Sequence, residues 1–309
     1  MKKIISQVKT FCVNDLKLTY VLTLTVFLGI LIVVNYQLDF ESSVLRPLKR
    51  TSFYPVYTFL FYGLPYYGAF LLYAFFYGQW RIFSNKLFWL STLTAIGVMT
   101  FNESVYLHQL LIEKYIHPEL QYFTRKCAND FLSALMYFIP MYIYWKIIDA
   151  KYQPLYGFSF QNFNVKPYLV MLACMVPLLT IASFNADFQD TYPVYKDGGF
   201  SAVVNIPEWI SVVCFEFCYG ADFVMVEFLF RGFMVMTLVE VIGIHAVLPM
   251  ATVYCVFHFG KPAGETISSF FGGTLLGIVA YHSRSIYGGI FVHWGIAFLM
   301  EVFAFWQKS

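Results

Sequence analysis

Three polar clusters interrupt the apolar C-terminal third of this 309-residue chain. They contain Glu227 with Arg231, then His258 with Lys261 and Glu265, and finally His293. Ionisable groups inside apolar runs are costly to place in a membrane, so they are expected to face the interior of a helical bundle. A carboxylate and two imidazoles that meet there can activate water and transfer protons, which is the chemistry of hydrolysis. We therefore expect the three clusters to converge on one active centre.

Each cluster taken alone also has a purely structural interpretation. Glu227 and Arg231 are four residues apart with the acid first, which favours an ion pair on one helix face and can simply fix helix packing. His258 ends an apolar run before a helix-breaking Gly-Lys-Pro segment, where it can hydrogen-bond a carbonyl. Glu265 suits the first turn of the next helix. His293 lies within an apolar run, where an imidazole needs a partner, so it is the hardest to explain structurally.

Composition identifies the chain as a membrane protein. Hydrophobic residues make up 59% and charged residues 12%, whereas soluble domains carry about 25% charged residues. The mean hydropathy of +0.63 agrees. A net charge of +2 without a basic tract excludes nucleic acid as a partner and leaves membrane lipids as the surroundings. Cys214 and Cys218 share a helix face, but no further soft ligands nearby complete a metal site.

Apolar runs long enough to cross a bilayer predict an all-α, polytopic transmembrane bundle of about eight or nine spans, because a span needs about 20 apolar residues. The predicted spans are 18–38, 56–78, 87–101, 131–148, 167–184, 208–236, 242–259, 266–282 and 286–306. The run 87–101 is the shortest and the least secure of them. We expect a multi-pass protein of a bacterial inner membrane.

Two polar segments divide the chain into parts. The segment 102–130 is patterned as an amphipathic connection within the N-terminal part, 1–184. The polar loop 185–207 separates that part from residues 208–309, which hold all three clusters and are expected to form the catalytic helical core. The sequence shows no internal repeat, which weighs against a transporter built from inverted repeats.

The three polar clusters also match, in order and spacing, a set of three sequence motifs. The pattern Glu-Glu-x-x-x-Arg, then Phe-x-x-x-His, then His followed four residues later by Asn or a small residue is matched in order. The matching segments are Val226-Glu227 to Arg231, Tyr254 to His258, and His293 to Ala297. Over about residues 206–305 the chain thus resembles the CAAX protease and bacteriocin-processing family of intramembrane proteases, which includes the Ras-converting endopeptidase.

The resemblance implies roles for these residues and also marks two departures. In the family, the first Glu of the pair and the second-motif His are implicated in activating the attacking water, and the third-motif Asn helps to hold the oxyanion. Here these first and last positions are Val226 and Ala297, which carry no polar group. Either Glu227 takes the role of base, or Asp222 does from one turn before Val226, or proteolysis has been lost.

Our first hypothesis is therefore an intramembrane endopeptidase. A carboxylate, Glu227 first and Asp222 second, would activate water together with His258. His293 would stabilise the oxyanion or assist the leaving amine, and Arg231 would orient Glu227. A Zn²⁺ bound by His258, His293 and Glu227 and a metal-free mechanism both stay open. The substrates would be membrane-associated peptides, either prenylated protein C-termini or small exported peptides.

Two alternatives use the same residues differently. A catalytically inactive scaffold or partner-binding protein would keep the bundle and lock Glu227 to Arg231. A proton-coupled transporter would use the buried groups as a relay. The positions of the carboxylates relative to both histidines separate the first alternative from the enzyme. The sequence does not fix the oligomeric state.

Overall fold

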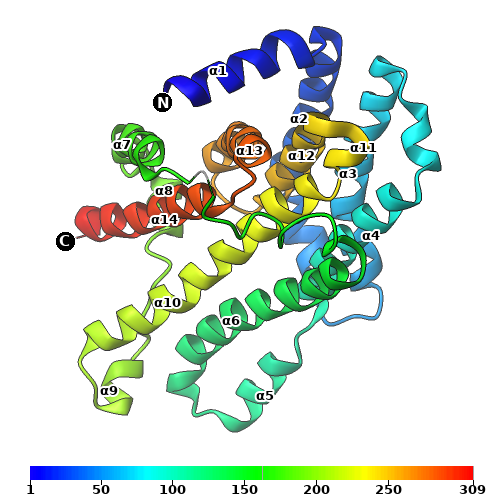
Figure 1. Ribbon diagram of the computed structural model, residues 1–309. Helices are drawn as coiled ribbons and strands as arrows, with labels where there is room; N and C mark the ends of the chain where they lie inside the picture. The colour runs from blue at the N-terminus through cyan, green and yellow to red at the C-terminus, as the bar shows by residue number, and fades with distance from the viewer. Residues whose placement is uncertain (162, 309) are drawn as a thin grey trace.

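The computed structural model describes residues 1–161 and 163–308. Within these residues the chain is helical and contains no β-strand, so the predicted all-α bundle is confirmed. Figure 1 shows long helices that cross one another at varied angles, with the N- and C-terminal helices on the same side of the view. The C-terminal third of the chain packs on helices of the N-terminal part as well as on itself.

The part of the chain before the loop at 185–207 contributes seven α-helices within the described residues. They are α1 (Lys2–Thr10), α2 (Leu18–Leu38), α3 (Tyr54–Tyr77), α4 (Lys86–Ser104), α5 (Leu107–Tyr115), α6 (Pro118–Tyr144) and α7 (Val165–Ala182). Short π- or 3₁₀-helical segments join or extend them: η1 (Phe11–Asp15), η2 (Glu41–Leu45), η3 (Arg46–Leu48), η4 (Trp80–Ser84) and η5 (Trp145–Asp149). Helix α6 begins at Pro118, so it includes the last part of the connection predicted at 102–130.

The polar loop predicted at 185–207 contains two short helices, and the C-terminal third follows it. The loop helices are α8 (Ala186–Thr191) and α9 (Phe200–Val204). The later elements are α10 (Glu208–Glu227), η6 (Phe228–Met234), α11 (Val239–Ile242), η7 (Gly243–Ala246), α12 (Val247–Phe257), α13 (Ala263–Ser283) and α14 (Tyr287–Lys308).

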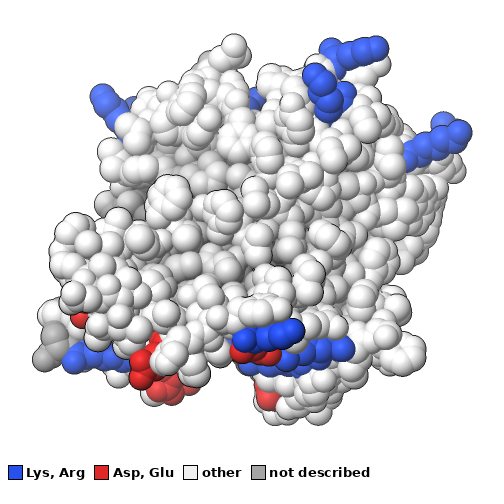
Figure 2. All heavy atoms as spheres, turned by 90° about the horizontal axis from the view of Figure 1, so that it is seen from below, with Lys and Arg blue, Asp and Glu red and all other residues white. Residues whose placement is uncertain are grey.

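Seven helical stretches of the described residues are long and apolar enough to cross a membrane, fewer than the eight or nine spans predicted. Two differences account for the number. The run 87–101 lies in α4, which does not qualify, and the runs 208–236 and 242–259 belong to one helical stretch, Glu208–Phe257. The chain is thus an integral, multi-pass membrane protein. On the face in Figure 2, charged residues gather at two opposite edges, and a broad band between them lacks charge.

The core sits where the C-terminal elements meet. Helix α12 packs on α13 and α3, while α10 packs on α6 and α14. All of η6 is buried, as is nearly all of α12. Gly277 allows the close approach of α13 to α12, because a Cβ there would lie 2.8 Å from Met250 and 2.9 Å from Val247. These contacts fix the positions of three helices that carry the predicted site residues.

Candidate active site

Glu227 and Arg231 lie where α10 passes into the π-helical turn η6. Arg231 Nη1 is 2.8 Å from Glu227 Oε1, and the two side chains are 1% and 0% exposed. The spacing of four residues places both groups on one side of the helix, as the sequence predicts. In a buried ion pair of this kind each group compensates the charge of the other, and either one alone would be uncompensated.

His293 of α14 joins this pair from the other side. Its Nδ1 is 3.0 Å from Glu227 Oε1, and its side chain is 14% exposed. An ionised carboxylate only accepts hydrogen bonds, so Nδ1 carries the hydrogen and donates it. In the neutral imidazole Nε2 is then an acceptor. The Glu227 carboxylate therefore fixes the His293 tautomer that leaves a basic nitrogen on the opposite side of the ring.

A small residue allows α14 to approach the carboxylate so closely. A Cβ at Gly289 would collide with Glu227 Oε2, so a glycine is required for this packing. Oε2 is buried and has no hydrogen-bond partner of its own. The Gly288-Gly289 pair thus lets α14 deliver His293 to Glu227, one helical turn further on.

His258 ends α12 and is joined to the group through Tyr254. The Nδ1 of His258 is 2.9 Å from the carbonyl oxygen of Tyr254, and the two rings pack edge to face with centroids 4.5 Å apart. The Tyr254 hydroxyl in turn lies 3.3 Å from His293 Nε2. Sequence reasoning noted Tyr254 only as the first position of the second motif. Its spacing of four from His258, which places both on one helix face, is the signal that could have identified it.

Asp222 lies outside this group. Its carboxylate accepts a hydrogen bond of 2.8 Å from Ser133 of α6. It lines a cavity of about 210 Å³ with Glu103, Asp130 and His108, none of which belongs to the predicted site. Ser133 of α6 thus holds the Asp222 carboxylate, and a role for Asp222 as the base stays a prediction.

The predicted zinc ligands do not form a ready metal site. Among residues 1–161 and 163–308, no three His, Cys, Asp or Glu side chains cluster closely enough to hold a metal ion. His293 directs Nδ1 to Glu227 and Nε2 to Tyr254, while His258 uses Nδ1 on a backbone carbonyl. This donor set does not fit the three-ligand arrangement, so we derive no step through a metal.

The two departures from the motifs are buried within the same core. Val226 and Ala297 are 3% and 5% exposed. Neither side chain can donate or accept a hydrogen bond, so any polar group of the site must come from another position.

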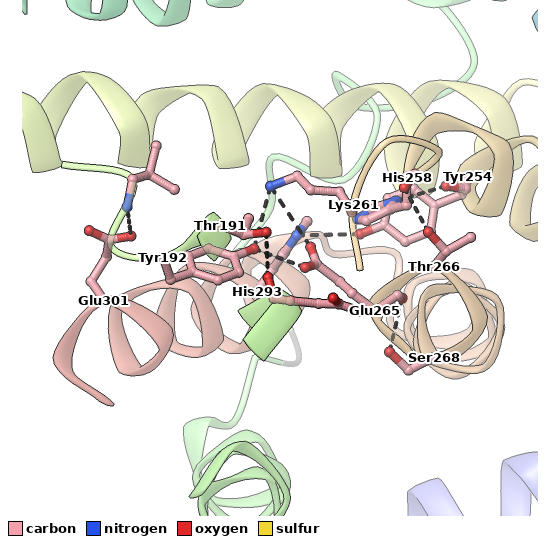
Figure 3. A network of polar contacts seen from close by, with 12 residues as sticks. Thr191, Tyr192, Tyr254, His258, Lys261, Glu265, Thr266, Ser268, His293 and Glu301 are labelled. Atoms are coloured by element: carbon pink, nitrogen blue, oxygen red, sulfur yellow. Dashed lines mark hydrogen bonds and ion pairs between the residues drawn. The ribbon is translucent and has the colours of Figure 1, made fainter. Parts of the chain in front are cut away.

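The segment around Tyr192 is tied to the C-terminal helices beside the site (Figure 3). The Tyr192 hydroxyl donates to Glu265 Oε2 at 2.9 Å, and Lys261 Nζ lies 3.4 Å from it. Glu301 accepts hydrogen bonds from the backbone N–H groups of Val194 and Tyr195 at 2.7 and 3.2 Å. Burial, reinforced by the neighbouring carboxylate of Glu265, raises the pKa of Tyr192 far above its usual range. Tyr192 therefore remains a donor at neutral pH.

Comparison with known families supports the assignment made from the motifs. A family model described as type II CAAX prenyl endopeptidase Rce1-like matches residues 209–299. The resemblance to CAAX-type intramembrane proteases is confirmed over these residues, which contain Glu227, Arg231, His258 and His293. Searches of curated proteins and of solved structures find no significant match. The match and the seven apolar helices support a CAAX-protease-like membrane endopeptidase in general terms.

Proposed function

We propose that this protein hydrolyses peptide bonds of membrane-associated substrates, and that prenylated protein C-termini are the substrate class. The observation that carries the proposal is the buried Glu227 carboxylate, which contacts both Arg231 and His293 within the segment matched by the Rce1-like family model. A charged carboxylate that orients an imidazole is the arrangement by which many hydrolases prepare a general base.

In this proposal His293 activates the water, and Glu227 acts on His293. The Glu227 side chain is fully buried, whereas that of His293 is 14% exposed, so the imidazole is the more accessible of the two groups. The Nε2 atom takes a proton from water as the hydroxide adds to the substrate carbonyl. Glu227 then stabilises the imidazolium, and Arg231, 2.8 Å away, orients the Glu227 carboxylate. This reverses the roles expected from the sequence, where Glu227 was the first choice of base.

His258 lies beside the Tyr254 ring and offers a further polar group to the site. Its Nδ1 engages the Tyr254 carbonyl, which leaves Nε2 available to a substrate or a water. The His293 imidazolium returns its proton to the leaving amine when the C–N bond breaks. The net reaction consumes one water and restores the starting protonation of the site. We further propose that the membrane is a bacterial inner membrane.

Cleavage in reconstituted vesicles tests the proposal. The probe is a fluorogenic peptide ending in a farnesylated Cys and three further residues, compared with the same peptide without the farnesyl group. We expect cleavage of the farnesylated probe by the wild-type protein. Glu227→Gln keeps the side-chain shape but removes the charge, and should lower the rate by about 100-fold or more.

Glu216→Gln is the matched control for this variant. Glu216 lies on the same helix α10, about three turns earlier, and is not in contact with His293. Wild-type rates in Glu216→Gln with loss of rate in Glu227→Gln would support the proposal. No cleavage of either probe by the folded wild-type protein, or equal rates in all three proteins, would refute it.

A non-catalytic scaffold is the second candidate, and one observation favours it. Glu227 is fully buried and in contact with Arg231, as that alternative predicts, and Val226 carries no acid beside it. A scaffold would bind the farnesylated probe without cleaving it. Retention of the intact probe by vesicles that carry the protein would therefore separate a binder from an enzyme.

A further inference from the structure

Tyr254 contacts three of the predicted site groups. Its hydroxyl lies 3.3 Å from His293 Nε2, and its ring packs against the His258 imidazole. The guanidinium of Arg231 stands over the ring face, with Cζ 4.0 Å from the centroid. The residue is only 4% exposed. Tyr254 therefore sits at the centre of the group formed by helices α10, α12 and α14.

The ring is held on several sides, so the position of its hydroxyl is fixed in advance. Phe230 packs edge to face on it at 4.8 Å. Gly273 of α13 approaches so closely that a Cβ there would lie 2.9 Å from Tyr254 Cδ1. A preorganised donor of this kind needs no rearrangement when charge develops on a substrate.

The hydroxyl also has a bond that it can exchange. Because His293 Nδ1 donates to Glu227, Nε2 accepts, so the Tyr254 O–H is the donor in their contact. A distance of 3.3 Å is longer than an ordinary hydrogen bond from a hydroxyl, and such a bond is weak. A water that binds His293 Nε2 displaces it at little cost and leaves the O–H free to donate elsewhere.

We propose that the Tyr254 hydroxyl is the hydrogen-bond donor to the oxyanion that forms when water adds to the substrate carbonyl. Ala297, at the third-motif position, has no side-chain donor, whereas Tyr254 places one beside the nitrogen that takes the proton from water. The carbonyl oxygen gains the electron pair of the C=O bond as the new C–O bond forms, and the Tyr254 O–H donates to it. This inference rests on the proposed function, with His293 as the base.

Tyr254→Phe tests the inference because it removes only the hydroxyl and keeps the ring that packs on Arg231, Phe230 and His258. We expect kcat on the farnesylated fluorogenic peptide to fall by about 100-fold with KM nearly unchanged. Tyr144→Phe is the matched control. It removes a buried hydroxyl that lies 2.9 Å from Ser91 Oγ, on α6 and α4, and should leave kcat unchanged.

A second pair of variants moves the hydroxyl instead of removing it. Gly273→Ala presses on the Tyr254 ring and should lower kcat by about 10-fold. Gly272→Ala adds the same methyl group to the preceding position, where nothing lies within 4 Å, and should retain the wild-type kcat. The pair guards against a general effect of filling a glycine in α13.

The outcomes distinguish a failure of the role of Tyr254 from a failure of the proposed peptidase function. An active wild-type protein whose Tyr254→Phe variant keeps its kcat overturns the role of Tyr254 alone. A folded wild-type protein that cleaves no probe overturns the proposed function and this inference with it. A Tyr254→Phe variant that loses kcat while Tyr144→Phe does not supports the inference.

Discussion

Two carboxylates of helix α10, Glu227 and Asp222, lie in different surroundings. Glu227 meets Arg231 and His293 in a compact group, and its side chain is 0% exposed. Asp222, five residues earlier, turns to α6, bonds Ser133 and lines a polar cavity. At 100° per residue the two side chains leave the helix about 140° apart. The same residue chemistry on one helix thus gives a closed ion-paired centre on one face and a cavity wall on the other.

The largest effect is expected where the compact centre loses its cation. Arg231→Met leaves the Glu227 carboxylate buried with only His293, and removing one partner of a buried pair costs about 3–5 kcal/mol. Thermal unfolding in detergent, followed by helix content, measures the loss. The double variant Arg231→Met/Glu227→Gln removes the stranded charge and should recover part of the stability. A single variant as stable as the wild-type protein would mean that the pair does not hold this centre together.

Adding a methyl group beside Glu227, in Gly289→Ala, should have a smaller effect on stability and a clearer one on the cleavage rate. The carboxylate end of Glu227 is flexible in principle, but Gly289→Ala can be accommodated only if it moves away from Arg231 and His293. We expect a loss of cleavage rate of about 10-fold with a modest change in stability. Gly264→Ala on α13, where nothing lies within 4 Å, is the control. Equal rates in both variants would show that Glu227 need not stay in place.

The sequence predicted the compact centre better than the cavity, and helix geometry explains why. Glu227 and Arg231 follow the i, i+4 rule, so their pairing could be read from spacing alone. The order of the motifs implied that His293 would meet Glu227. The close approach of α14 to α10 that Gly289 permits could not be predicted from the sequence. The hydrogen bond between Asp222 and Ser133 could not be predicted, because the two residues are 89 positions apart in sequence and nothing local selects the pair.

The number of spans differs for a related reason. The runs 208–236 and 242–259 belong to one helical stretch, Glu208–Phe257, but the backbone turns within it, because α11 ends at Gly243 with a φ of +59° and the 3₁₀ segment η7 precedes α12. The apolar pattern predicts the two runs, but it does not report whether a loop or short helical turns join them. The sequence named Tyr254 as a motif position but did not predict its contact with His293. Its spacing of four from His258 places the two on one helix face, whereas the contact with His293, 39 residues later, depends on how α14 packs on α12.

The cavity face should tolerate a change that the compact centre does not. Asp222→Asn keeps the hydrogen bond from Ser133 and removes the charge, and we expect cleavage within about threefold of the wild-type rate because Asp222 does not contact His293. Ser133→Ala removes the same bond from the α6 side and should behave alike. The rate on the farnesylated peptide, beside that of Glu227→Gln, is the measurement. A loss as large as that of Glu227→Gln would place Asp222 in the chemistry and end the distinction between the two faces.

The smallest effect is expected for an ion pair of nearly the same length at the surface. Glu113 of α5 lies 2.7 Å from Arg50, but the two side chains are 35% and 43% exposed. The hydrogen bond from Arg50 lowers the pKa of Glu113 below the ordinary value of 4.5. A lowered carboxyl pKa stabilises the folded state above that value, and the contribution is lost as pH falls through the folded pKa. Water and salt screen such a pair, so the contribution is small at any pH.

Unfolding of Glu113→Gln and wild-type protein between pH 7 and pH 3 tests this prediction. We expect a slightly lower midpoint temperature for the variant at pH 7, and the difference should shrink as pH falls through the folded pKa of Glu113. Molar salt should remove the difference at pH 7 as well. A change in midpoint temperature at pH 7 as large as that of Arg231→Met would mean that the length of an Arg–Glu contact determines its contribution to stability. A change far smaller than that of Arg231→Met would show that burial, and not the length of the contact, makes the Arg231–Glu227 pair the more important for stability.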